Sequence, residues 1–257
     1  MALEIVKAGG KFLRPGGREG SWNVGPNTRD PDDYVASPFD FVVLPRSEVV
    51  NALDDLKHLR PDMTPMLFGS PHDAGILFER FGSDKTAPAD WIAQARSFDL
   101  DQWLASRQSD HEEDQDPDEP FPDRGPWPDS ATPSTQLSVQ VVSLLPGQTP
   151  AAIIGLLPIT DPTETAAELH FGGWNDCPNP EVHICIARRW HEKYGAVQVS
   201  NGHDAIEFRV AKPVTDRQEA LDLAWLQYLY CSDGLPGTLE EAAAELVGST
   251  VWHFWWD

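Results

Sequence analysis

A proline-rich acidic segment near the middle of the chain, Ser109–Ser130, constrains the fold more than any other feature of the sequence. It contains nine acidic residues, five prolines and one arginine, and it carries 8 of the 22 net negative charges. Dense like charge repels itself and proline removes backbone donors, so neither helix nor sheet is favoured. We therefore interpret residues 109–135 as a flexible linker or a long surface loop. The alternative is an acidic arm that docks on a basic partner.

The linker divides the chain into an N-terminal region, residues 1–108, and a C-terminal region, residues 136–257. In the N-terminal region, runs of β-forming residues alternate with apolar residues at helical spacing. This order is typical of a small α/β or α+β unit. We expect a meander of short strands at 1–34, strands at 39–44 and 65–68, a helix that begins at Ser47, and short helices at 89–95 and 100–107.

The C-terminal region has clearer signals. Asn179, Pro180 and the stop residue Gly195 frame a helix, and Asn201-Gly202 is a hairpin signal between two strand-like runs. We also expect strands at 137–145, 151–159, 197–200 and 206–210, a turn at Pro146-Gly147, a short helix at 163–169, helices capped by Thr215 and Thr238, and a buried central strand at the terminal VWHFWWD.

Together these patterns predict an α+β protein. Amphipathic helices would pack on a mixed or antiparallel sheet, with a smaller N-terminal α/β part. Hydrophobic residues make up 40% of the chain and ten residues are tryptophan, so a substantial core can be buried.

The net charge of −22 limits the classes of partner. It argues against nucleic acids and anionic membranes and favours a basic protein as a charged partner. The first residues lack a secretory signal, and the longest apolar run, residues 151–159, is too short to span a bilayer. The three cysteines, an odd number, argue against a disulfide framework. We therefore expect a cytoplasmic protein.

Four motifs of the C-terminal region resemble a known family. They are GGWNDCP (Gly172–Pro178), ARRWHEKYGA (Ala187–Ala196), YLYCSD (Tyr228–Asp233) and WHFWWD (Trp252–Asp257). In order and spacing they resemble the bacterial family called domain of unknown function 4253. The N-terminal region resembles longer members only loosely, around PMLFG. The resemblance implies an α+β fold and a bacterial host, and it implies no reaction.

The GGWNDCP loop leads into the helix that begins at Pro180. Its glycines permit unusual backbone angles, and its Asn and Asp favour a turn. Trp174, Asn175 and Asp176 are therefore candidates for positioning a ligand at the N-terminus of the helix. The structural interpretation, which we favour, is that they only cap and orient the helix.

Charged and aromatic residues on the same helix and at the C-terminus are further candidates. Arg188 and His191 share a helix face, and Arg189 lies close to the apolar stripe. We expect an arginine to clamp Asp257 and its terminal carboxylate, with half of a ligand site as the alternative. Trp256 belongs to an aromatic cluster that we assign to the core rather than to a ligand surface.

Cys177, His183, His191 and Cys231 are residue types that bind zinc. Their spacing matches no compact zinc motif, and such residues on amphipathic helices are usually packed in a core. Cys177 with His183 or with His191 is also a candidate nucleophile pair. Neither a GxSxG elbow nor a phosphate-binding loop occurs. Because zinc-motif spacing is also missing, we expect no metal and no cofactor.

Two functional hypotheses follow. The first is a non-catalytic acidic binding protein that captures a basic protein, like an immunity protein or a regulatory partner. The second is an enzyme or a small-ligand sensor, with a pocket between the Trp174 loop, the Arg188/His191 helix and the C-terminal WWD. The absence of a catalytic motif favours the first hypothesis.

Overall fold

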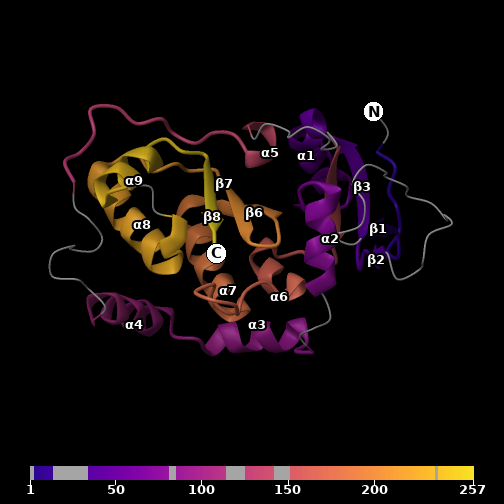
Figure 1. The fold of residues 1–257 in the computed structure, drawn as a ribbon, viewed down its shortest axis with the longest axis horizontal. Helices are drawn as coiled ribbons and strands as arrows, with labels where there is room; N and C mark the ends of the chain where they lie inside the picture. The colour runs from indigo at the N-terminus through magenta and orange to yellow at the C-terminus, as the bar shows by residue number, and fades with distance from the viewer. Residues whose placement is uncertain (1–2, 14–33, 81–84, 114–124, 142–150, 235–236) are drawn as a thin grey trace.

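A mixed six-stranded sheet forms the centre of the protein (Figure 1). In the computed structural model, residues 3–13, 34–80, 85–113, 125–141, 151–234 and 237–257 are described. The strand order is β3-β5-β4-β6-β7-β8, and β1 pairs with β2 in a separate two-stranded sheet. The strands are β1 (Lys11–Leu13), β2 (Tyr34–Ala36), β3 (Asp40–Pro45), β4 (Thr64–Leu67), β5 (Ala151–Leu157), β6 (Ala196–Asn201), β7 (Ala205–Val210) and β8 (Val251–Trp255).

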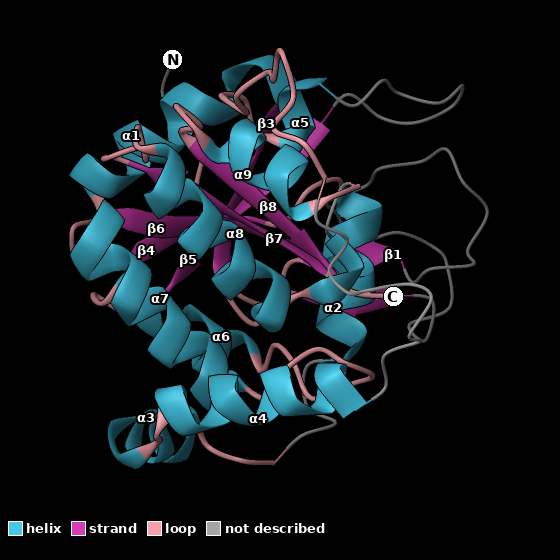
Figure 2. Cartoon of the chain, turned by 90° about the vertical axis from the view of Figure 1, so that its left-hand side faces the viewer, coloured by secondary structure: helices cyan, strands magenta, loops and turns pink. Residues whose placement is uncertain are grey.

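Helices pack on both faces of this sheet. The described helices are α1 (Val49–Leu59), α2 (Pro71–Arg80), α3 (Pro88–Ser97), α4 (Leu100–Glu113), α5 (Ser138–Val141), α6 (Thr165–Leu169), α7 (Pro180–Tyr194), α8 (Arg217–Tyr230) and α9 (Leu239–Leu246). Apolar residues of α1 pack on one face, and α2, α7, α8 and α9 contribute to the core on the other. Figure 2 shows α3 and α4 beside α6 and α7, outside the helix layer. The predicted α+β class is therefore confirmed.

One core joins residues from both halves of the chain. β4 lies between β5 and β6, so a strand that precedes the acidic segment pairs on both sides with strands that follow it. The larger core cluster includes Phe39 and Phe68 as well as Trp190 and Trp256. None of the described helices is long and apolar enough to cross a membrane.

Local signals placed most elements of the C-terminal region correctly. Gly195 ends α7 in the left-handed conformation, with φ of 61°. β6 and β7 form the predicted antiparallel hairpin around Asn201-Gly202. Thr238 and Glu241 form a reciprocal capping box at the start of α9.

The strand predicted at 137–145 is wrong where it can be compared with the structure. Residues 138–141 form the short helix α5, whereas residues 142–145 and the predicted turn at Pro146-Gly147 lie outside the described residues. The alternating pattern of this segment imitates a strand, but the Gln140 side chain accepts the backbone N–H of Leu137 at 3.0 Å and closes a turn. Tertiary anchoring of Ser138 to Glu207 then holds that turn in place.

The C-terminal strand was predicted to be central and is instead an edge strand. β8 pairs only with β7 among the described strands, and its burial alternates. Trp252 and Phe254 are buried, whereas His253 and Trp255 point to the exposed face. The carbonyl of Ser134 accepts the backbone N–H groups of Thr250 and Val251, so a loop satisfies the start of this edge.

Two helix boundaries differ from the predictions. The N-cap of α8 is Asp216 rather than Thr215, and its carboxylate accepts the backbone N–H of Glu219 at 2.9 Å. A carboxylate is favoured there because it also faces the positive end of the helix dipole. Ser47 does not cap α1; it lies in the 3₁₀ turn Arg46–Glu48 that precedes the helix.

The acidic segment is ordered at both described ends. Residues 109–113, predicted to be linker, form the end of α4, where the Gln108 side chain donates to the Glu112 carboxylate at 2.8 Å. At the other end, Gly125 donates its backbone N–H to Glu240 of α9 at 3.0 Å. Residues 114–124, and with them most of the predicted docking arm, lie outside the described residues.

Candidate functional site

The described sheet has one parallel strand pair, and the segments that follow its two strands lie at the same edge of the sheet. β4 and β6 run parallel, with Leu67 opposite Ser200. In sheets of this kind, ligands bind beyond the carboxyl ends of parallel strands. Here β4 continues through Gly69 into α2, and β6 continues through residues 202–204 into β7.

The turn between β4 and α2 is held by a reciprocal cap. The backbone N–H of Ser70 donates to the carboxylate of Asp73 at 2.8 Å, and the backbone N–H of Asp73 donates to the Ser70 hydroxyl at 3.3 Å. Gly69 has a φ of 78°, and a Cβ atom there would lie 2.8 Å from that carboxylate. A glycine is therefore needed where the strand turns into the helix.

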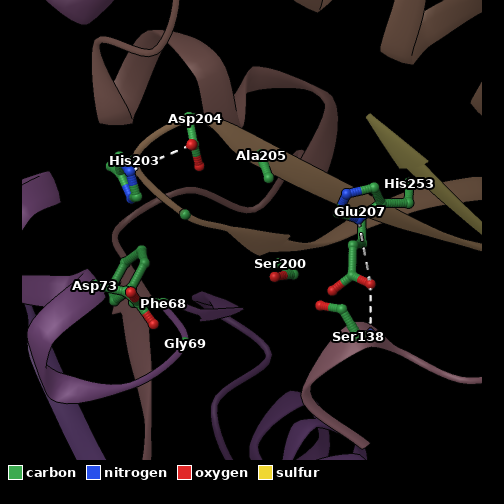
Figure 3. A pocket seen from close by; sticks show the side chains of 11 residues that line it. Phe68, Gly69, Asp73, Ser138, Ser200, His203, Asp204, Ala205, Glu207 and His253 are labelled. Atoms are coloured by element: carbon green, nitrogen blue, oxygen red, sulfur yellow. Dashed lines mark hydrogen bonds and ion pairs between the residues drawn. The ribbon is translucent and has the colours of Figure 1, made fainter. Parts of the chain in front are cut away.

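A cavity of about 180 Å³ lies between this turn and the β6–β7 hairpin (Figure 3). Its eleven lining residues include three carboxylates, two histidines and two serines, and none of them is a lysine or an arginine. They are Phe68, Gly69, Asp73, Ser138, Ser200, Gly202, His203, Asp204, Ala205, Glu207 and His253.

Glu207 is the most unusual of these residues, because its side chain is only 3% exposed. Its Oε1 accepts the backbone N–H of Ser138 at 2.7 Å and lies 3.8 Å from Nδ1 of His253. Its Oε2 is buried and has no hydrogen-bond partner among the described residues. A buried carboxylate is costly unless both of its oxygens are satisfied. One oxygen of Glu207 therefore lacks a compensating hydrogen-bond donor.

The hairpin side of the cavity carries a second carboxylate, which is already engaged. Asp204 accepts the indole N–H of Trp255 at 3.0 Å, and its Oδ2 lies 3.3 Å from Nε2 of His203. Within the described part of the chain, no three His, Cys, Asp or Glu side chains converge as metal ligands would. The carboxylates of the lining are suited to binding a cationic group.

The Trp174 loop lies beside the C-terminus, as a shared site would require. Asn175 donates its side-chain N–H to the backbone carbonyl of Asp257. Asp176 is an exposed residue 3.8 Å from the guanidinium of Arg107. The ring of Trp174 contacts Phe171 edge-to-face, and Phe171 in turn contacts the buried Trp256. The assignment of Trp256 to the core is confirmed by its exposure of 1%.

The predicted arginine clamp on Asp257 is wrong. Arg188 pairs with Glu164 at 3.2 Å, and Arg189 pairs with Asp101 of α4 at 2.6 Å. Both guanidinium groups thus bind carboxylates on other segments that pack beside α7, and neither pairs with Asp257. The backbone N–H of Asp257 instead donates to the carboxylate of Asp233 at 3.1 Å.

The four candidate zinc ligands do not form one site. His191 is exposed, and its ring lies 3.1 Å from the carbonyl of Ala196. Cys231 donates its thiol to the carbonyl of Trp255 at 3.0 Å. Only Cys177 and His183 meet, with 3.5 Å between Sγ and Nε2.

Cys177 and His183 belong to a buried network that includes Tyr230. The Tyr230 hydroxyl contacts Nδ1 of His183, and the carbonyl of Pro178 interacts with the same ring. The donor and acceptor roles of the two ring nitrogens depend on the tautomer of His183. Cys177 and His183, one of the two candidate nucleophile pairs, therefore lie together inside a buried network in which both ring nitrogens have contacts.

Burial keeps His183 neutral, which makes a testable prediction. Its pKa is lowered from 6.5 to about 3, since desolvation disfavours the imidazolium. Between these values only the unfolded state binds the proton. Protonation of His183 in the unfolded state therefore leaves the free energy of unfolding unchanged above about pH 6.5. Below that pH it lowers the free energy of unfolding by about 1.4 kcal/mol per pH unit, until the folded state also binds the proton near pH 3. We expect the His183 ring signals in NMR spectra to stay constant from about pH 8 to about pH 4.5. A titration midpoint near pH 6 would contradict this.

Sequence reasoning did not find the cavity residues. One signal was available: in the 206–210 strand Ile206, Phe208 and Val210 face the core, so Glu207 must face the opposite side of the sheet. A strand in the middle of a sheet is covered on both sides, and an acid at that position is expected to be buried. Phe68 and Asp73 line the cavity only because β4 pairs with β6, and no short stretch of sequence predicts that pairing.

The comparisons with known proteins concern the C-terminal part of the chain. Residues 153–257 match the model of the family described as Domain of unknown function (DUF4253). No curated protein and no solved structure matches the chain with significance. The matched range contains seven of the eleven cavity residues, Glu207 among them. The resemblance inferred from the GGWNDCP and WHFWWD motifs is therefore confirmed for residues 153–257, the part of the chain that matches this family model.

Proposed function

We propose that this protein is a non-catalytic acidic binding protein that captures a basic protein in the bacterial cytoplasm. An immunity protein or a regulatory partner of a basic protein would act in this way. The observation that carries the proposal is the excess of carboxylates over cations. The chain has 41 Asp and Glu residues and 19 Lys and Arg residues, so 22 carboxylates remain even if every cation takes a separate carboxylate.

The described ion pairs support this argument. Cations on several elements are already paired with carboxylates of the same chain, and so they do not offset the remaining negative charge for an approaching partner. These pairs are Lys7–Asp40, Arg60–Asp62, Arg107–Asp176, Arg188–Glu164, Arg189–Asp101, Lys193–Glu219 and Arg209–Asp54.

The second candidate function is an enzyme or a small-ligand sensor. Arg188 and Arg189 are engaged in ion pairs, which weakens the case for a pocket beside the Trp174 loop. The observation that favours this candidate is the cavity at β4 and β6, where Glu207 lies 3.8 Å from His253. A carboxylate beside a histidine is a combination that general acid–base catalysis uses. The sequence contains no catalytic motif that would use this pair, so we rank this candidate second.

The test is to capture a partner from the native host at low salt and to measure the salt dependence of the association. Electrostatic capture predicts one basic protein bound in stoichiometric amount. Its association rate constant should fall by about tenfold or more between low salt and about 0.5 M salt, because screening shortens the reach of the charges.

A matched control separates charge from shape. Acetylating the lysines of the captured partner should reduce binding, whereas acetylating the few lysines of the acidic protein should not weaken it. An association rate that is unchanged between low and high salt would refute electrostatic capture.

A further inference from the structure

The cavity at the carboxyl ends of β4 and β6 has the features of a receptor for one cationic group. We propose that it binds a single alkylammonium or guanidinium group, the chemistry of a lysine or arginine side chain of the basic partner or of a small amine. That the cation comes from a partner protein rests on the proposed function. That the site binds a cation rests on the structure alone.

Glu207 carries the first step of the argument. Its side chain is only 3% exposed, it lines the cavity, and its Oε2 has no partner among the described residues. The backbone N–H of Ser138 holds Oε1 at 2.7 Å, so the carboxylate is oriented before any ligand arrives. An ammonium or guanidinium donor would satisfy the remaining oxygen with a charge-assisted hydrogen bond.

The charge around Glu207 favours a cation over an anion or a neutral ligand. Asp73 and Asp204 line the same cavity, and no lysine or arginine does. The nearest arginine on the same strand, Arg209, binds Asp54 of α1 at 2.9 Å. Figure 3 shows the carboxylates of Asp73, Asp204 and Glu207 on different sides of the space, so a cation inside it would have negative charge around it.

The size of the cavity limits what it can accept. Drug-sized ligands occupy pockets of about 300–1,000 Å³, whereas this cavity measures about 180 Å³. That volume suits one side chain or a small amine. The methyl group of Ala205 provides apolar wall for the alkyl stem, and the hydroxyls of Ser138 and Ser200 are hydrogen-bond acceptors for the polar head.

The experiment uses the full chain and two defined probes, ethylguanidinium and n-propylammonium, with N-ethylurea as the neutral comparison. Binding is followed by NMR through the backbone amide of Ser138, which donates to Glu207. We expect saturable 1:1 binding of the cations and none of the urea. Glu207→Gln keeps the size of the side chain and removes its charge, so affinity for the cations should fall about tenfold or more.

Two further variants make the result specific. Ala205→Leu should also abolish probe binding, because it reduces the space without touching Glu207. Glu112→Gln removes a charge from the exposed end of α4 and should leave probe binding unchanged. If Glu207→Gln fails to fold, these two variants still test the site. Probe binding that persists in Ala205→Leu would refute it.

Partner capture by the same variants distinguishes the source of the cation. Loss of both probe binding and partner capture in Glu207→Gln supports a side chain of the partner as the occupant. Loss of probe binding with normal capture supports a small amine as the occupant. Wild-type protein that binds no cationic probe at about 50 mM overturns the cavity inference and leaves the proposed function standing. Glu207-dependent probe binding without any basic partner supports the cavity and refutes the proposed function.

Discussion

Gly172→Ala is expected to destabilise the protein by about 3–5 kcal/mol, a large part of the stability of an ordinary domain. Gly172 has a φ of 113°, which side-chain-bearing residues rarely adopt. A Cβ atom there would lie 1.9 Å from the carbonyl oxygen of Pro178 and 2.8 Å from Nε2 of His183. The first of these is a backbone atom at the start of α7, so the loop or the helix must move. Urea unfolding followed by tryptophan fluorescence measures the loss.

Gly9→Ala is the matched control for this prediction. Gly9 also has a positive φ, of 94°, but a Cβ atom there would meet nothing within 4 Å. Its replacement isolates the cost of the backbone conformation, about 1–2 kcal/mol. Equal losses for the two variants would show that the contact with Pro178 contributes nothing, which would contradict the packing of the GGWNDCP loop described above.

Trp190→Ala is expected to cost about 3–5 kcal/mol, because it removes the ring at the centre of the aromatic core. Trp190 is only 1% exposed. It stacks on Phe254 with 5.1 Å between ring centroids, and it meets Phe208, Tyr230 and Trp252 edge-to-face. The vacated volume cannot close without moving both α7 and the β7–β8 pair. The midpoint of urea unfolding should fall accordingly, with an unchanged slope.

Leu59→Ala provides the comparison for Trp190→Ala. Leu59 is 66% exposed at the end of α1, and its truncation should change the free energy of unfolding by less than about 0.5 kcal/mol. If Trp190→Ala lost less than about 1 kcal/mol, α7 would not pack against the sheet as described.

Predictions that depended on interactions between residues close in the sequence were correct more often than predictions that depended on distant residues. α7 was placed correctly because its signals are local: Pro180 suits a first turn, and Gly195 adopts the left-handed conformation that ends the helix. The hairpin at Asn201-Gly202 and the capping box at Thr238 are signals of the same kind. The strand predicted at 137–145 failed where it could be compared because alternation within one segment does not reveal which neighbour anchors it.

The candidate site was less predictable than the fold. The Trp174 loop and the C-terminus were expected to lie together, and Asn175 does contact Asp257. The arginines expected to join them pair with Glu164 and Asp101, because an ion pair forms with whichever carboxylate the fold brings within reach. Glu207 was missed altogether, since nothing in its immediate sequence shows that Ser138 and β4 lie beside it.

By itself, the sequence determined the α+β class, the strongly negative charge, the boundaries of α7 and the resemblance of residues 153–257 to the family whose model they match. Only the tertiary structure decided that β8 is an edge strand, that strands from both sides of the acidic segment share one sheet, and that a buried carboxylate lines a cavity at the carboxyl ends of β4 and β6. The physical reason is distance along the chain. Capping, turn formation and side-chain periodicity act over a few residues, whereas strand order and the partners of a buried charge depend on contacts between residues far apart in the sequence.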